Sequence, residues 1–264
     1  MRRKRMMAAL AVAALLAAVP APAQERSAPA TPVDTIAVGQ PLPRWDRLRT
    51  GTSRYLRYRE ENGRRIAMDI WSRTVAIEPD PQGGASRLHI TQSWNGATLP
   101  FDRTVESWFE LRTFRPLRHR TRAVRGEQVV EDAFLFTPAA VTGDPGLAGN
   151  RHADLRVATP EPTFNFETDM ELLATLPWRA GYVARINFYH PGGGPPQWYL
   201  YEVTGVESLD FGGRSVPCWV VAIDYGAQGD ARFWIDQQSQ TVLKVATRGP
   251  DIQGTLYKML LPGE

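Results

Sequence analysis

The sequence predicts an all-β fold, in the form of one large curved sheet, a barrel or a sandwich. From residue 44 onward, short runs of β-branched and aromatic residues are separated by Gly, Asn and Asp, which is the pattern of strands joined by turns. About a dozen such runs follow one another at regular spacing, and no repeat of fixed period is found. A single segment, near residues 167–176, has helical character instead.

Turn residues set the boundaries of the predicted strands. The pair Asn62-Gly63 lies between two strand-like runs and indicates a tight hairpin, because both residues tolerate positive φ. Residues 142–165 are mostly loop-like, with a short strand near 155–158. The other predicted strands are 54–60, 65–77, 87–94, 105–114, 117–124, 129–136, 182–189, 197–203, 207–211, 215–225, 231–235, 241–247 and 254–261.

The predicted helix over 167–176 has recognisable start and stop signals. Thr168 is followed three residues later by Glu171, which is the spacing of a capping box. Pro177 cannot continue a helix and disfavours helical geometry at the residue before it. We therefore expect about two helical turns that interrupt the sheet.

The first 23 residues have the three parts of a secretory signal peptide. Basic residues at positions 2–5 precede an apolar run at 6–19, and Ala21 and Ala23 provide small residues at the −3 and −1 positions of a cleavage site. The apolar run has 14 residues, whereas a membrane-spanning helix needs about 20. We therefore expect cleavage after Ala23 and export, most simply to a bacterial periplasm.

The rest of the chain is expected to form one domain. Residues 24–43 are rich in Pro, Ala and small polar residues and predict a flexible lead-in. Residues 44–264 then form a single all-β domain, since this length is ample to bury a core. No segment of the mature chain is long and apolar enough to predict a transmembrane span.

Charge and cysteine content narrow the classes of partner. Four of the 31 basic residues lie in the predicted signal peptide, which leaves 27 basic against 28 acidic residues and argues against strong attraction to nucleic acid. The charge is uneven, with 18 basic and 11 acidic residues over 24–125 and 9 and 17 over 126–264. Such asymmetry indicates either a charged partner or mutual attraction of the halves. The single cysteine, Cys218, lies in an apolar run and is expected to be a buried, unreactive side chain.

Motifs of familiar chemistries are absent from the sequence. It contains no His-Glu-x-x-His, paired Cys-x-x-Cys, EF-hand loop, Gly-x-Ser-x-Gly or phosphate-binding glycine motif. We therefore assign no catalytic, metal-binding or cofactor-binding residue and expect no cofactor. Enzymatic activity stays open, because a catalytic triad is recognised by its geometry and not by its order in the chain.

Arginines provide the one set of candidate binding residues. Arg57 and Arg59 share one face of a predicted strand, and Arg118, Arg120 and Arg122 share one face of another, because side chains alternate along a strand. One interpretation is a surface that binds anionic lipid head groups or acidic glycans. The other is a solvated outer face that the acidic C-terminal half partly neutralises.

Two segments resemble a family of bacterial envelope proteins, domain-of-unknown-function family 3108. Residues 166–182 resemble its segment in which a helix precedes LPL-x-x-G, and residues 231–236 with 241–244 resemble its penultimate hairpin, f-W-v-d … g-x-v-l-k. The resemblance extends over about 50–262. It implies a fold like the lipoprotein carriers LolA and LolB: an incomplete antiparallel barrel with helical segments on its concave side. It implies no catalytic residues, and the chain lacks the lipid-anchoring cysteine of LolB.

The leading functional hypothesis is a non-enzymatic protein that binds a hydrophobic or amphipathic ligand of the cell envelope, such as a lipid or a lipoprotein acyl chain. The export signal, the aromatic-rich strands and the missing catalytic motifs favour it. One alternative is an envelope scaffold that binds a protein partner, and another is a hydrolase with an unrecognised site. A lined cavity favours the first, an exposed apolar patch the second, and a cleft of titratable groups with perturbed pKa values the third.

Overall fold

The computed structural model describes residues 32–80, 83–95 and 102–263. The predicted signal peptide over 1–23 and its cleavage site lie outside the described residues. Within the described residues, no helix has the length and apolar character needed to cross a membrane.

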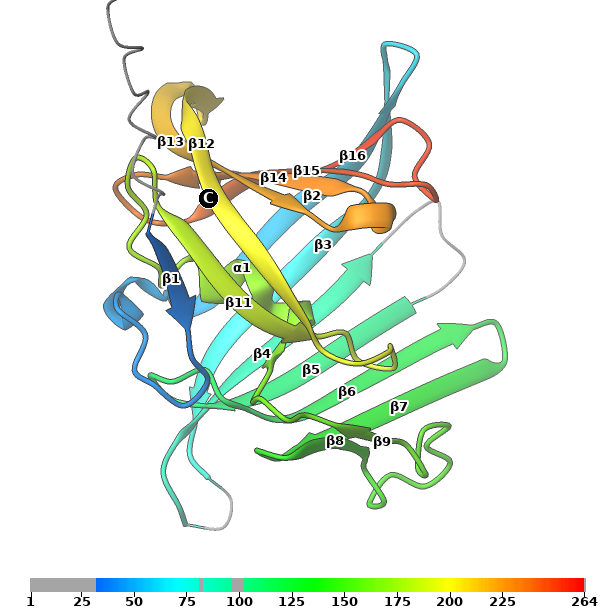
Figure 1. Ribbon diagram of the computed structural model, residues 1–264. Coiled ribbons are helices and arrows are strands. Elements are labelled where there is room, and N and C mark those ends of the chain that lie inside the picture. The colour runs from blue at the N-terminus through cyan, green and yellow to red at the C-terminus, as the bar shows by residue number, and fades with distance from the viewer. Residues whose placement is uncertain (1–31, 81–82, 96–101, 264) are drawn as a thin grey trace, which may run out of the picture. The chain divides into compact units, whose positions relative to one another are not determined.

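Most of the described chain folds into one sheet (Figure 1). Along the sheet the strand order is β1-β11-β12-β13-β14-β15-β16-β2-β3-β4-β5-β6-β7-β8-β9, and β10 pairs with β11 beside this path. The strands are β1 Val33–Ile36, β2 Gly51–Glu61, β3 Arg64–Glu78, β4 Arg87–Asn95, β5 Asp102–Glu110, β6 Pro116–Arg125, β7 Gln128–Phe136, β8 Ala140–Gly143, β9 Arg156–Ala158, β10 Phe164–Asn165, β11 Val183–Tyr189, β12 Gln197–Phe211, β13 Arg214–Asp224, β14 Asp230–Asp236, β15 Val242–Arg248 and β16 Thr255–Leu260.

The sheet confirms the predicted fold class of one large, curved, mainly antiparallel sheet that does not close into a barrel. Among the strands that the structure describes, β1 and β10 run parallel to their neighbour β11, and the other pairs are antiparallel. The strands β16 and β2, from opposite ends of the chain, pair side by side and join the two halves of the sheet. Figure 1 shows the sheet curving around the α-helix α1, which spans Asp169–Leu173.

Local chemistry explains several strand boundaries. The predicted hairpin at Asn62-Gly63 is confirmed, and both residues have positive φ, 50° and 73°. The strand predicted over 105–114 ends earlier, at the end of β5, because Arg112 and Phe114 adopt positive φ of 66° and 54° and leave the extended conformation. Two strands predicted over 197–203 and 207–211 form one continuous strand, β12, because a register shift beside Gly205 absorbs the irregularity.

Two other expectations need correction. Part of the lead-in predicted over 24–43 is strand β1, because its backbone pairs with β11 over four residues. The single short helix predicted near 167–176 is confirmed, but it spans fewer residues than expected, and a 3-10 turn, η2 (Phe166–Thr168), precedes α1. Thr168 does not form the predicted capping box, because its hydroxyl donates to the Asn165 carbonyl and the Asn165 side chain accepts from the Glu167 amide.

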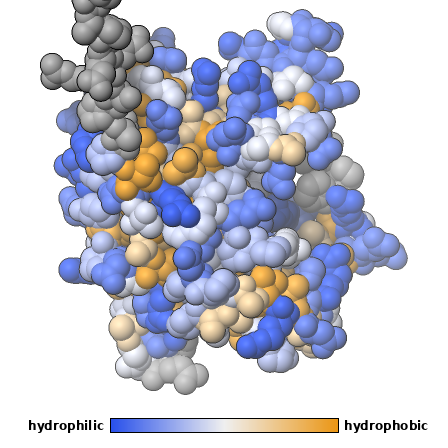
Figure 2. Space-filling view, viewed as in Figure 1, coloured by the Kyte–Doolittle hydropathy of each residue, from blue (hydrophilic) through white to orange (hydrophobic). Residues whose placement is uncertain are grey.

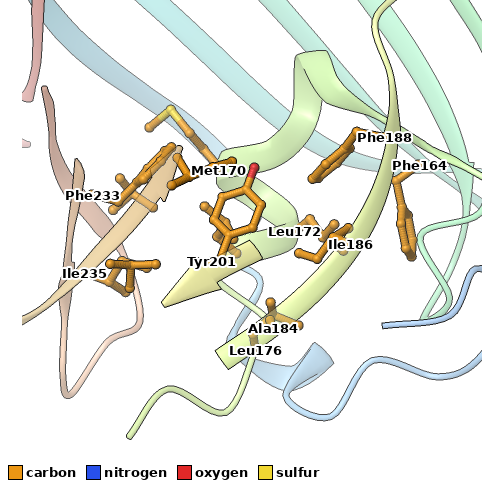
Figure 3. Packing of buried hydrophobic residues seen from close by; sticks show 14 of the residues in the cluster. Phe164, Met170, Leu172, Leu176, Ala184, Ile186, Phe188, Tyr201, Phe233 and Ile235 are labelled. Atoms are coloured by element: carbon orange, nitrogen blue, oxygen red, sulfur yellow. The ribbon is translucent and has the colours of Figure 1, made fainter. Parts of the chain in front are cut away.

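The segment η2–α1 fills the concave side of the sheet with apolar side chains. Met170, Leu172 and Leu173 are buried, and Figure 3 shows Met170 and Leu172 among aromatic and aliphatic side chains from β11, β12 and β14, including Tyr201 and Phe233. Full burial of each such side chain contributes about 1.5–3 kcal/mol of transfer free energy. Tertiary packing therefore holds this short helix in place, since five residues are too few for a helix to be stable alone.

Candidate functional site

A cavity of about 370 Å³ lies on the concave side of the sheet, next to η2 and the start of α1. We call it the central cavity. This volume lies within the range of small-molecule binding sites. Its lining comes from β2, β3, β4, β5, η2, α1, β14, β15, β16 and the loops after β11 and β13, and consists of Arg57, Trp71, Arg73, Trp94, Arg103, Phe166, Glu167, Asp169, His190, Tyr225, Gln228, Ala231, Phe233, Val245, Thr247 and Lys258.

Aromatic rings form a large part of the cavity wall. Trp71 and Trp94 lie opposite each other on β3 and β4 and stack at 5.6 Å between ring centroids. The ring centroid of Phe166 lies 3.9 Å from that of His190, and 5.8 Å from that of Tyr225 in an edge-to-face arrangement. Burial lowers the pKa of His190, which favours the neutral ring at neutral pH. These rings offer apolar and π surface to a bound molecule.

Three of the four cations in the wall are neutralised by carboxylates. The Arg57 guanidinium forms two hydrogen bonds of 2.7 Å to Asp69, its cross-strand partner on β3. Arg103 on β5 lies 3.3 Å from the Glu167 carboxylate. Burial alone would raise the pKa of Glu167, but Arg103 and other nearby cations outweigh it and hold that pKa below its usual value.

The third neutralised cation, Arg73, ties the sheet to the helix. Its guanidinium donates to both carboxylate oxygens of Glu171 in α1, and it also donates to the side chain of Gln92 on β4 at 2.9 Å. The Arg73 and Glu171 side chains are only 2% and 9% exposed. Burial disfavours the charge on Arg73, yet the attraction of Glu171 raises the pKa of Arg73. This buried pair positions α1 over the concave face.

The remaining charged groups of the cavity, Lys258 and Asp169, have no such partner. The Lys258 ammonium lies 4.5 Å from the centroid of the Trp71 ring, and burial lowers its pKa. One Asp169 oxygen accepts a hydrogen bond from the Met170 amide, and burial raises the pKa of Asp169 to about 6. Within the described part of the chain, neither group has an oppositely charged side chain within 4.0 Å.

The structure separates the five arginines predicted as binding residues. Arg57 reaches the central cavity, whereas Arg59 pairs with its strand neighbour Glu61 at 3.2 Å. Side chains alternate along β6, and His119 is on its buried face, so Arg118, Arg120 and Arg122 point to the other, outer face. Their ion pairs are Arg118 with Asp144 at 2.8 Å, and Arg120 and Arg122 with Glu131 at 2.9 and 3.5 Å.

The sequence patterns did not single out Lys258 or Asp169 as candidate binding residues. The scarcity of lysine was an available signal, since the whole chain has three lysines against 28 arginines. An ammonium at a cavity wall is chemically distinct from a guanidinium, because its pKa shifts more readily on burial.

A second polar cluster lies in the core beside η2, and its residues do not line the central cavity. Ser107 and His119 face each other on β5 and β6, with 2.8 Å between the Ser107 hydroxyl and His119 Nδ1, and Asn165 approaches the same nitrogen at 3.0 Å. Burial lowers the pKa of His119 to about 4. Ser107 and His119 are fully buried, so this serine–histidine pair is closed to a substrate.

Neither the single cysteine nor a cluster of metal-ligating side chains provides a reactive site in the described part of the chain. Cys218 is fully buried, and burial raises the pKa of its thiol to about 11, which suppresses the reactive thiolate. Among the residues that the structure describes, no group of three or more His, Cys, Asp or Glu side chains could hold a metal ion.

Comparison with known proteins places the chain in a family. No curated protein matches it. Among solved structures, the crystal structure of a β-barrel-like protein of domain of unknown function DUF1849 from Brucella abortus is similar at 8% identity and a TM-score of 0.47, covering 80% of this chain and 94% of that one. The family model "Protein of unknown function (DUF3108)" matches residues 53–260, which confirms the resemblance seen in the sequence. The chain belongs to the DUF3108 family.

Proposed function

We propose that this protein is an exported binding protein that holds an amphipathic ligand of the cell envelope in the central cavity. The observation that supports the proposal is the composition of the cavity wall, which combines aromatic rings with charged groups at Lys258 and Asp169. Ligand sites typically combine an apolar lining with a few placed polar groups. An amphipathic molecule matches both parts of this wall.

The geometry also indicates how such a ligand lies. The charged groups Lys258 and Asp169 come from β16 and α1, whereas Phe233 and Val245 add apolar surface from β14 and β15. We infer that the polar head contacts Lys258 and Asp169, and that the first part of an apolar chain contacts Phe233 and Val245. A cavity of about 370 Å³ holds a head group and a short stretch of chain, so the rest of a long acyl chain would extend out of it.

Native mass spectrometry tests the proposal directly. The mature protein is purified from a periplasmic extract and measured intact, and lipids extracted from the same sample are identified. A reproducible lipid adduct near one-to-one occupancy supports binding. A clean mass without adduct, and no uptake on incubation with envelope extract, contradicts it and favours a scaffold. The same intact mass tests export, since cleavage after Ala23 leaves a chain that begins at Gln24.

A matched pair of substitutions locates the ligand. Thr247 on β15 lines the central cavity, so Thr247→Trp narrows it. Val206 on β12 is 54% exposed and lies outside the cavity lining, so Val206→Trp adds the same bulk elsewhere. We expect the adduct to disappear from Thr247→Trp and to persist in Val206→Trp. Equal loss or equal retention in the two variants would show that the ligand is not in the central cavity.

Hydrolysis is a second candidate function, and the perturbed groups of the cavity favour it. Asp169, with its raised pKa near 6, could donate or accept a proton near neutral pH. A panel of ester, amide and glycoside substrates tests this candidate. Turnover that Asp169→Asn abolishes, with binding retained, would support a hydrolase; absence of turnover across the panel would reject it.

The scaffold alternative draws less support from the visible surface. Figure 2 shows a mainly hydrophilic face on which hydrophobic residues form several separate patches instead of one broad area. Broad apolar patches are the usual mark of a protein-binding surface. The face in Figure 2 therefore does not favour the scaffold alternative.

A further inference from the structure

The charges of the central cavity leave one unpaired group of each sign. Arg57, Arg73 and Arg103 are engaged with Asp69, Glu171 and Glu167, respectively. Lys258 and Asp169 remain, each without an ion-pair partner within 4.0 Å in the described part of the chain. With the partner carboxylates Asp69 and Glu171 counted, the charges balance, and the two groups that lack an ion-pair partner are of opposite sign.

We propose that the central cavity selects a zwitterionic head group, whose anionic group binds the Lys258 ammonium and whose cationic group binds the Asp169 carboxylate. This inference rests on the proposed function and names the class of ligand that the site accepts. A phosphate or carboxylate beside an amine or quaternary ammonium, as in a phosphoethanolamine or phosphocholine lipid head, has this chemistry.

Burial of Asp169 and partial burial of Lys258 explain why a partner from outside the chain stabilises both charges. Asp169 is 9% exposed, and Lys258 is held against the Trp71 ring. A charge removed from water without a partner costs free energy, and a ligand charge placed beside it recovers part of that cost. Lys258 and Asp169 feel each other's charge across the cavity without forming an ion pair, so a ligand with both signs satisfies both at once.

Aromatic residues near the acidic group add to the selection. Phe166 and Tyr225 line the same cavity and meet edge to face. The faces of aromatic rings attract ammonium groups, and this attraction increases when the site is desolvated. A purely anionic head would leave Asp169 unsatisfied, and a neutral head would leave both charges unsatisfied.

Calorimetric titration with three monomeric short-chain probes tests the inference. The probes are dihexanoylphosphatidylethanolamine, which is zwitterionic, dihexanoylphosphatidylglycerol, which is anionic, and the neutral hexyl glucoside. We expect the wild-type protein to bind the zwitterionic lipid about tenfold or more tighter than either of the others. Free phosphoethanolamine is titrated in parallel to distinguish a lipid ligand from a small soluble zwitterion. If it binds as tightly as the zwitterionic lipid, the head-group inference is supported and the ligand is the small zwitterion.

Three substitutions assign the two contacts. Asp169→Asn is expected to lose the preference for the zwitterionic over the anionic lipid. Lys258→Met is expected to weaken both phospholipids about tenfold and leave hexyl glucoside unchanged. Lys244→Met is the matched control, because Lys244 also lies over an aromatic ring, 4.4 Å from the Trp234 centroid, but does not line the cavity. It is expected to bind all three probes as the wild type does.

Each result on the wild-type protein decides the inference even where a variant fails to fold. Equal affinity for the three probes, or preference for the anionic lipid, overturns the zwitterionic selection while the proposed binding function survives. Failure to bind any probe, together with a clean native mass, overturns the proposed function itself. Thermal unfolding of each variant confirms that a change in affinity reports contact with the ligand and not loss of the fold.

Discussion

Replacement of Glu171 by leucine should destabilise the protein strongly, because it leaves the buried Arg73 without its carboxylate. The Arg73 side chain is 2% exposed and donates to both Glu171 oxygens, so the substitution removes its two charge-assisted hydrogen bonds. The acceptors that remain are the Gln92 side chain and the Glu167 carbonyl, and neither carries the neutralising charge. The guanidinium then stays charged in the interior.

The expected loss is about 3–5 kcal/mol of unfolding free energy, the cost of breaking a buried ion pair by removal of one partner. The combined variant Arg73→Met with Glu171→Leu replaces the pair by apolar side chains and should recover most of that loss. Asp230→Asn is the control, because the Asp230–Arg248 pair is exposed, with side chains 41% and 57% accessible. An exposed pair contributes about 0–1 kcal/mol.

Urea denaturation followed by tryptophan fluorescence measures these differences, since the chain has eight tryptophans. If the free energy of unfolding falls with urea concentration at a similar slope in all variants, the differences in their urea midpoints reflect differences in stability. A loss below about 1 kcal/mol in Glu171→Leu, equal to that of the exposed control, would refute the reasoning. A combined variant no more stable than Glu171→Leu would show that the uncompensated charge on Arg73 is not the cause.

Three further predictions concern titration and packing. The pKa of His119 is near 4 in the folded state and 6.5 in the unfolded state, so its contribution to the free energy of unfolding is present above pH 6.5. This contribution, up to about 3 kcal/mol, is lost as pH falls toward 4. Urea denaturation at a series of pH values measures the loss, which should be absent from His119→Gln. Folding raises the pKa of Asp169 from 3.8 to about 6, so its contribution to the free energy of unfolding is present below pH 3.8 and lost as pH rises through 6. Asp169→Asn should therefore be more stable than the wild type at neutral pH by up to about 3 kcal/mol. An equal or lower stability of this variant at neutral pH would contradict the burial argument. A Cβ atom at Gly143 would lie 1.8 Å from the His152 carbonyl oxygen, so Gly143→Ala should lower the free energy of unfolding by at least about 1–3 kcal/mol. Gly194 has open space around it, so Gly194→Ala should lower it by less than about 1 kcal/mol. Thermal or urea unfolding of both variants measures the difference.

Local chemistry accounts for the parts of the fold that the sequence predicts well. Alternating side chains and turn residues identify most strands, because side-chain alternation and the positive φ of residues such as Asn62 and Gly63 depend on near neighbours only. The short strand β1 was missed, since four residues flanked by Pro-rich sequence extend only by pairing with β11. The helix was found but drawn too long, because tertiary packing and not an N-terminal cap holds α1.

The candidate site depended on contacts between distant parts of the chain. Alternation shows that Arg118, Arg120 and Arg122 share a face, yet it does not tell a concave face from a convex one, because both faces of a strand alternate with the same period. Packing of the His119 face of β6 into the core leaves these three on the other face, in ion pairs, whereas Arg57 lines the central cavity.

By itself, the sequence determined the all-β class, the family and most strand positions, since these follow from local patterns. Only the tertiary structure decided which charges remain unpaired. Pairing of β16 with β2 sets Lys258 opposite Arg57, and the contact of α1 with β3 joins residues 98 positions apart, Arg73 and Glu171. The physical reason is that neutralisation of a buried charge depends on distances of a few ångströms between groups that are far apart in the chain.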